Sequence, residues 1–123
     1  MTDQAKILIV DDEAPLVQLC QFLLESEGYS VNGTTSGNQA LRMIAEDMPD
    51  VVVLDVMMPL MSGIEVCRQI RLQHPDRSPI ILMYTADGSV ETERRGLAAG
   101  ANGILTKDAL VSDLPAKIGA FLS

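Results

Sequence analysis

The sequence predicts an α/β fold in which five parallel strands, in the order 2-1-3-4-5, form a sheet covered by helices on both faces. Short apolar runs of strand length alternate along the chain with stretches whose apolar residues recur every three or four positions. The runs are apolar at successive positions, which is typical of strands buried on both faces. Strictly alternating strands and helices need right-handed crossovers between parallel strands, and these give a doubly wound sheet between two helix layers.

The expected elements follow from these two patterns in chain order. Strands are expected at residues 7–10, 29–35, 51–54, 79–85 and 103–106. Helical spacing predicts helices around residues 16–23, 40–44, 62–73, 90–99 and 110–121. The second strand carries Ser30, Asn32 and Thr34, so it is more polar than the first, third and fourth strands. A polar strand fits an edge of the sheet, in agreement with the order 2-1-3-4-5.

Turn and capping residues support these boundaries. Pro15 suits the first turn of the first helix, and Ser36 can cap the second. Ser62 and Glu65 form an S-x-x-E pattern, which predicts a capping box at the start of the third helix. Helix ends are marked by Gly28, Pro75 and Gly100.

Length and composition are typical of one globular domain. With 123 residues, 47% of them apolar, we expect residues 1–123 to form a single domain with no output domain attached. Nine basic and 17 acidic residues give a net charge of −8, so direct binding to nucleic acid is not expected. Cys20 and Cys67 lie far apart without a CxxC pattern, and neither a leader nor a membrane-length apolar run is recognisable. We expect reduced thiols in a cytoplasmic protein.

Charged and polar residues follow four of the five strands. Asp11 and Asp12 follow the first strand, Asp55 the third, Thr85 ends the fourth, and Lys107 follows the fifth. Functional groups in doubly wound sheets gather beyond the carboxyl ends of the strands, at the switch point between strands one and three. Three aspartates there would repel one another unless a cation lay between them. Carboxylate oxygens without His or Cys favour a hard ion, and a shallow, hydrated site suits Mg²⁺.

This group of residues predicts phosphoryl transfer to Asp55. Mg²⁺ and the ammonium of Lys107 would screen the oxygens of an incoming phosphoryl group, and Asp55 would attack the phosphorus in line. Taken singly, each residue has a simpler explanation, since aspartate and threonine often cap helices and lysine often lies exposed. Their meeting at one edge of the sheet is what favours chemistry.

Four separated segments resemble the receiver domain of two-component response regulators, chemotaxis regulators among them. The segments are ILIVDDE at 7–13, VVVLDVMMPLMSG at 51–63, Thr85-Ala86, and GANGILTK at 100–107. They stand in the family's order and spacing and cover essentially the whole chain. The resemblance implies a flavodoxin-like doubly wound fold, and the strand order given above is partly taken from it.

The resemblance also implies an acceptor and a metal site. Asp55 would be the phosphoacceptor and, together with Asp12, a direct ligand of Mg²⁺. Asp11 would bind the ion directly or through water. The backbone carbonyl of Met57, two residues after the acceptor, would supply a further ligand.

The residues that the resemblance assigns to the response depart in part from the family pattern. Thr85 would hydrogen-bond a phosphoryl oxygen and draw the following loop inward, while Lys107 would pair with the phosphoryl group. The family commonly has Tyr or Phe three residues before the lysine as a switch, whereas this chain has Ile104. Asp108 follows the lysine, where the family usually has proline. Tyr84 is expected to point away from Thr85 and to have a packing role, because side chains alternate along a strand.

The function implied is that of a signalling switch, not of an enzyme with an external substrate. A phosphohistidine on a sensor histidine kinase or a phosphotransfer protein would donate the phosphoryl group, and the domain would catalyse its own phosphorylation and autodephosphorylation. It would then act on a downstream protein partner or output domain. A phosphorylation-dependent homodimer could form through the face of the fourth helix, fifth strand and fifth helix.

Three other functions fit the sequence less well. A receiver-like scaffold that acts without phosphorylation, the main alternative, would not need the acceptor, metal and lysine positions to be filled. A phosphatase with an aspartyl nucleophile would need a second acid where Met57 stands. A flavin carrier would need a loop rich in Ser, Thr and Gly after the first strand, where the acidic residues of this chain would repel phosphate.

Overall fold

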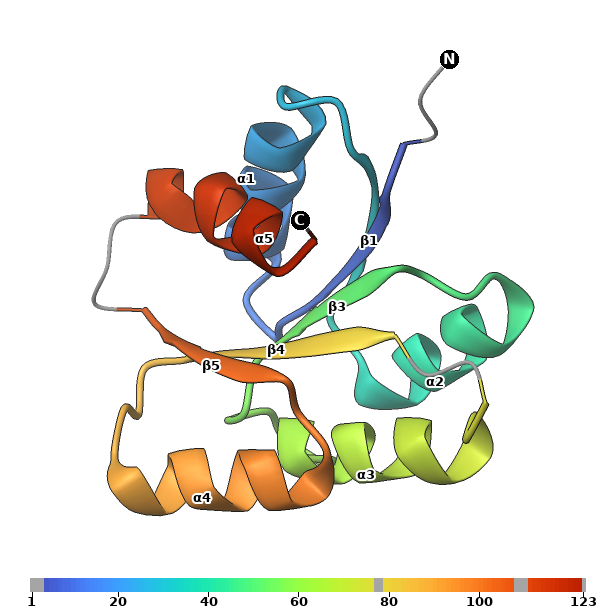
Figure 1. Ribbon diagram of the computed structural model, residues 1–123, viewed down its shortest axis with the longest axis vertical. Coiled ribbons are helices and arrows are strands. Elements are labelled where there is room, and N and C mark those ends of the chain that lie inside the picture. The colour runs from blue at the N-terminus through green and yellow to red at the C-terminus, as the bar shows by residue number, and fades with distance from the viewer. Residues whose placement is uncertain (1–3, 77–78, 108–110, 123) are drawn as a thin grey trace.

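A parallel sheet forms the centre of the computed structural model, which describes residues 4–76, 79–107 and 111–122 (Figure 1). Its five strands pair in the order β2-β1-β3-β4-β5, as the sequence predicts. β2 lies at an edge, with Ser30 and Asn32 exposed. The strands are β1 (Lys6–Val10), β2 (Ser30–Thr34), β3 (Val51–Leu54), β4 (Ile80–Thr85) and β5 (Gly103–Thr106).

Five helices cover the sheet from both sides in the described part of the chain. They are α1 (Ala14–Glu25), α2 (Gly37–Glu46), α3 (Gly63–Gln73), α4 (Val90–Ala99) and α5 (Leu114–Leu122). Figure 1 shows α1 and α5 on one face and α2, α3 and α4 on the other. Each face has its own hydrophobic core, and we call these the α1/α5 core and the α3/α4 core. The doubly wound prediction is therefore confirmed.

The last helix starts later than the sequence pattern suggests. Leu110 lies outside the described residues, and a 3₁₀ turn over Val111–Asp113 precedes α5. Pro115 explains the late start, because an α-helix that already included Val111 would need a hydrogen bond from an N–H that proline lacks. In the first turn of α5 the missing N–H costs nothing.

Helix capping follows the predicted residues with one difference. The Ser36 hydroxyl accepts a hydrogen bond from Gln39 N, and the Ser62 hydroxyl accepts one from Glu65 N, each at 3.2 Å. Half of the predicted capping box is therefore present. The Glu65 carboxylate accepts hydrogen bonds from the side chains of Arg68 and Gln69.

Both cysteines are buried thiols, as expected from the sequence. Cys20 belongs to the α1/α5 core and Cys67 to the α3/α4 core, so the sheet separates them. Among the helices of the described residues, none has the length and apolar character needed to cross a lipid bilayer.

Candidate functional site

The two central strands both end in buried carboxylates. Asp11 and Asp55 follow Val10 and Leu54, which are register partners, and they are only 2% and 4% exposed. The Asp55 amide donates to the Val10 carbonyl at 2.9 Å, so β3 stays joined to β1 one residue beyond Leu54. Asp12 is exposed. One carboxylate oxygen of each aspartate lies within 4.8 Å of the others, which confirms that the sheet brings the three together.

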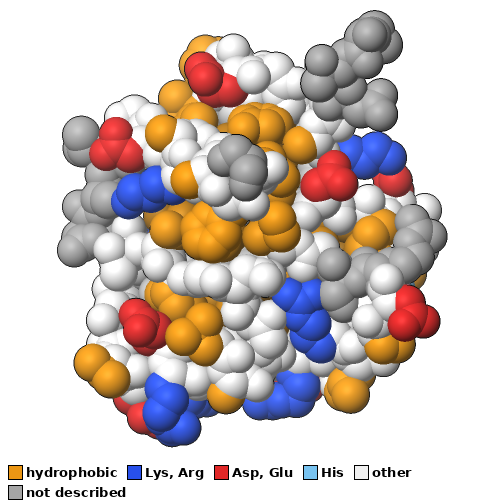
Figure 2. All heavy atoms as spheres, viewed as in Figure 1, with side chains coloured by type: hydrophobic (Ala, Val, Ile, Leu, Met, Phe, Trp, Pro, Cys, Tyr) orange, Lys and Arg blue, Asp and Glu red, His pale blue; other side chains and the backbone are white. Residues whose placement is uncertain are grey.

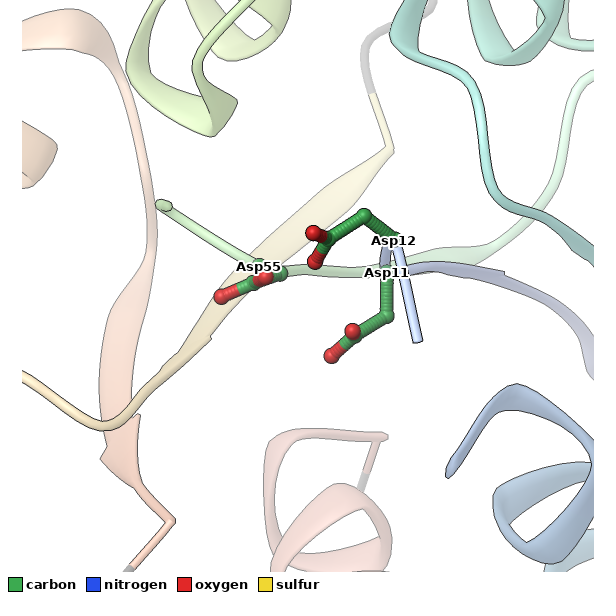
Figure 3. A group of neighbouring side chains, drawn as sticks. All are labelled: Asp11, Asp12 and Asp55. Carbon is green, nitrogen blue, oxygen red and sulfur yellow. The ribbon is translucent and has the colours of Figure 1, made fainter. Parts of the chain in front are cut away.

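The three side chains do not point the same way. Figure 3 shows the Asp12 carboxylate extended toward Asp55, whereas that of Asp11 turns to the other side. Asp11 also accepts a hydrogen bond from Glu13 N at 3.0 Å, which holds the start of the β1–α1 loop. The cluster therefore consists of one exposed carboxylate, that of Asp12, and two buried ones.

Glycine at position 63 lets the loop after β3 pack closely against the end of that strand. The Gly63 amide donates to the Val56 carbonyl at 3.0 Å, and a Cβ on Gly63 would overlap the backbone oxygen of Asp55. Within this loop Leu60 has a φ of 69°, in the left-handed region that non-glycine residues rarely adopt. The Met57 amide donates to Asp55 Oδ1 at 3.3 Å, so the loop also orients the Asp55 carboxylate.

Lys107 reaches the acidic cluster from the end of β5. Its amide donates to the Thr85 carbonyl at 2.8 Å, which fixes the backbone beside β4. Its ammonium donates to Asp11 Oδ2 at 2.7 Å and lies 3.5 Å from Asp55 Oδ1, with its side chain only 16% exposed. The predicted meeting of Lys107 with the aspartates is therefore present in the structure.

Burial and neighbouring charges shift the pKa values of this group. Burial, together with the charge of Asp11, raises the pKa of Asp55 to about 6, although Lys107 opposes the shift. Burial disfavours the charged form of Lys107, but its hydrogen bond to Asp11 and the charges of Asp11 and Asp55 outweigh this and raise its pKa. The pKa of Asp55 thus stays raised although Lys107 lies beside it.

The donor set fits a hard divalent cation. Asp11, Asp12 and Asp55 offer three carboxylate oxygens to one ammonium, and burial, followed by the charge of Asp11, raises the pKa of Asp55. All three ligands are oxygens and one of them is exposed, so bound waters could complete the coordination of Mg²⁺.

Thr85 is connected by hydrogen bonds to the start of α4. Thr85 is fully buried, and its hydroxyl accepts a hydrogen bond from the Asp87 amide at 3.0 Å. The Asp87 carboxylate in turn accepts from Ser89 N at 3.0 Å and from the Thr92 hydroxyl at 2.6 Å. Displacement of the Thr85 hydroxyl would therefore disturb the hydrogen bonds of Asp87 at the first turn of α4.

Ile104 packs against α4 rather than standing in open space. It is half-buried and joins the α3/α4 core. A Cβ on Gly96 would lie 2.9 Å from Ile104 Cδ1 and 3.5 Å from Met83 Cγ. Gly96, which costs about 1 kcal/mol of helix propensity relative to alanine, therefore gives Ile104 the space it occupies.

Two residues at the site were missed or underrated by sequence reasoning. Tyr84 faces away from Thr85 into the α1/α5 core, as expected, but its ring centroid also lies 5.7 Å from Lys107 Nζ. Strand alternation predicts the face that this ring occupies but not its approach to Lys107, which depends on the β4–β5 register. Asp87 was not singled out, although D-x-S-x-x-T is a readable capping pattern. Asp108, an expected departure from the family, lies outside the described residues.

Comparison with known proteins supports the class that fold and site define. A family model described as "Response regulator receiver domain" matches residues 7–119. The chain belongs to the response regulator receiver domain family.

Solved structures of similar proteins agree over nearly the whole chain. Chemotaxis protein CheY4 of Vibrio cholerae is 33% identical, with 96% of this chain and 98% of that chain covered and a TM-score of 0.90. A two-component response regulator of the LuxR family from Aurantimonas sp. SI85-9A1 is 32% identical, with 98% and 86% covered and a TM-score of 0.88. The DrrB receiver domain, described as BeF3 activated, is 31% identical, with 98% of each chain covered and a TM-score of 0.85.

Proposed function

We propose that this receiver domain is a phosphorylation-dependent switch in which Asp55 accepts a phosphoryl group. The observation that carries the proposal is the position of Asp55: it is buried, 3.5 Å from the ammonium of Lys107, and grouped with two more carboxylates. The donor is a phosphohistidine on a sensor histidine kinase or a phosphotransfer protein. Asp11, Asp12, Asp55 and the carbonyl of Met57 would hold Mg²⁺, and the charge of the ion would screen the phosphoryl oxygens.

The transfer is an in-line displacement at phosphorus. A carboxylate oxygen of Asp55 forms the new O–P bond while the N–P bond of the donor breaks, and the imidazole leaves with that electron pair. The Lys107 ammonium moves from Asp11 toward the new phosphoryl oxygens, which need a positive partner. Attack of water on the phosphorus later returns the Asp55 carboxylate and inorganic phosphate.

The response runs from Thr85 to a protein partner. The Thr85 hydroxyl can donate to a phosphoryl oxygen, and its link through Asp87 then shifts the start of α4. As the loop after Thr85 moves inward, the Ile104 side chain changes its packing beside Gly96. Residues 1–123 thus act as one domain whose output is a change in protein binding.

The face of α4, β5 and α5 offers surface for that partner or for a second copy of the domain. Leu97 and Phe121 are 47% and 38% exposed there. A Cβ on Gly103 would lie 2.6 Å from Phe121 Cζ, so the Phe121 ring covers β5. Figure 2 shows hydrophobic side chains gathered over α5.

Intact-protein mass after incubation with phosphoramidate, with and without Mg²⁺, tests the proposal. Wild type should gain one phosphoryl group only with Mg²⁺, and Asp55→Asn should gain none. Asp76→Asn, which changes an exposed aspartate on a loop far along the chain from the acceptor, is the matched control and should behave as wild type. No gain by wild type, with Mg²⁺ binding retained, would support a scaffold that acts without phosphorylation.

A further inference from the structure

Tyr84 is the aromatic residue in contact with the charged site, and it approaches from the face opposite to Thr85. It is 6% exposed and packs in the α1/α5 core. It is the second-to-last residue of β4, next to the carboxyl end of that strand. The register pairs it with Leu105, two residues before Lys107. The Lys107 side chain therefore leaves β5 directly beside the Tyr84 ring.

The ring and the carboxylates flank the Lys107 ammonium. Nζ lies 5.7 Å from the ring centroid of Tyr84, 2.7 Å from Asp11 Oδ2 and 3.5 Å from Asp55 Oδ1. A cation within about 6 Å of an aromatic face is attracted by the ring quadrupole, and more strongly when water is excluded. The Lys107 side chain is only 16% exposed, so this contact is largely shielded from water.

An aromatic partner suits a lysine that has to exchange one anion for another. The further carboxylate near the ammonium, Glu13, has its Oε1 at 3.9 Å from Nζ, beyond hydrogen-bond distance. A closer carboxylate would hold an N–H donor of the ammonium and compete with the phosphoryl group. A ring attracts the charge without accepting a conventional hydrogen bond, so the N–H donors stay available to Asp11 and Asp55.

We propose that Tyr84 is a positioning residue for Lys107: its ring holds the ammonium within reach of the Asp55 phosphoryl group. This inference rests on the proposed function of Asp55 and names a residue through which Lys107 acts. In this role the Tyr84 ring acts through Lys107 and not on Asp55 itself. Its hydroxyl is not required, because the attraction comes from the ring.

The test compares Tyr84→Leu and Tyr84→Phe with wild type in binding of beryllofluoride in the presence of Mg²⁺. Tyr84→Leu should bind roughly three- to tenfold more weakly, the factor expected for a cation–π contact. Tyr84→Phe should restore wild-type binding, and the affinity for Mg²⁺ alone should change little in either variant. Tyr29→Leu makes the same change at a half-buried tyrosine of the same core and should leave both affinities unchanged.

A double-mutant cycle separates positioning from core packing. In a Lys107→Gln background, Tyr84→Leu should have no further effect on beryllofluoride binding, because the group it positions is gone. A merely structural role would give the same loss in both backgrounds. Thermal unfolding of each variant shows whether the protein is folded in the assay.

Side-chain NMR of Lys107 gives a readout that needs no phosphoryl chemistry. The Tyr84 ring current should shift the Lys107 Hε resonances in wild type and Tyr84→Phe, and the shift should be lost in Tyr84→Leu. If the wild type binds no beryllofluoride, the proposed function fails. The NMR measurement still shows whether the Tyr84 ring contacts Lys107. Unchanged Lys107 resonances in Tyr84→Leu, or unchanged beryllofluoride affinity in a folded Tyr84→Leu protein, would overturn the inference.

Discussion

The two faces of the sheet surround Asp55 with different chemistry. On the α1/α5 face, Lys107 lies between the Tyr84 ring and buried carboxylates, so charge and an aromatic ring act together. On the α3/α4 face, Thr85 is linked through the Asp87 carboxylate to the start of α4, and Ile104 packs beside Gly96. Under the proposed function, capture of a phosphoryl group and its readout therefore depend on different faces of the sheet. Changes on the first face should alter capture, and changes on the second should alter packing.

The largest effect is expected from Lys107→Gln. Loss of the ammonium removes a positive partner of the phosphoryl oxygens, and a group of this kind is worth on the order of 100-fold in rate. Phosphoryl uptake from phosphoramidate, followed by intact mass, should slow by about that factor. Mg²⁺ affinity, measured by calorimetry, should rise because a positive charge leaves the acidic cluster.

Lys117→Gln, a half-buried lysine of α5, is the matched control and should leave both quantities unchanged. Equal losses of uptake and of Mg²⁺ affinity in Lys107→Gln would contradict the separate role given to the lysine.

A smaller effect is expected on the stability of the metal-free protein. Burial and the charge of Asp11 raise the pKa of Asp55 to about 6, so the folded state binds a proton more tightly than the unfolded chain. Protonated Asp55 therefore makes its full contribution to the stability of the folded state below about pH 4. This contribution decreases as the pH rises and is lost above about pH 6. Asp55→Asn should abolish this slope and, at pH 8, be more stable by on the order of 2 kcal/mol.

Urea unfolding at several pH values in chelator measures this difference. Addition of Mg²⁺ should reduce the gap between wild type and Asp55→Asn, because the cation stabilises the ionised cluster. The electrostatic description of the site would be contradicted if the free energy of unfolding of the wild type rose, relative to that of Asp55→Asn, between pH 4 and pH 6.

The smallest effect concerns the α3/α4 face. Gly96→Ala gains about 1 kcal/mol of helix propensity, but its methyl group would meet Ile104 Cδ1. In wild type the gain should therefore be cancelled, whereas in an Ile104→Val background, which lacks Cδ1, it should appear in full. Thermal or urea unfolding of the four proteins measures the coupling, and phosphoryl uptake should stay within about twofold throughout. Additive effects would show that Ile104 does not occupy the space that Gly96 leaves.

Much of the fold and the core of the site could be predicted from the sequence. Apolar runs at 7–10 and 51–54 identify the central strands, and Asp11 and Asp55 directly follow them, so strand adjacency alone brings these carboxylates together. The late start of α5 could not be predicted from hydrophobic spacing, because Pro115 acts through a missing backbone donor. Its effect depends on where the preceding turn ends.

The contacts between strands were harder to predict than the strands themselves. The approach of Tyr84 to Lys107 depends on the β4–β5 register, which pairs Tyr84 with Leu105 and is set by tertiary packing. The role of Gly96 likewise depends on how closely α4 lies on β5. Sequence patterns identify which face a residue occupies but not which side chain it meets from another element.

The most direct test of the account is to locate the phosphoryl group by chemical trapping. After incubation with phosphoramidate and Mg²⁺, borohydride reduces an acyl phosphate of aspartate to homoserine, and peptide mass spectrometry then reads each position. The account predicts homoserine at position 55 of the wild type, dependent on Mg²⁺. Homoserine at Asp11 or Asp12, or at no position while Mg²⁺ still binds, would contradict it.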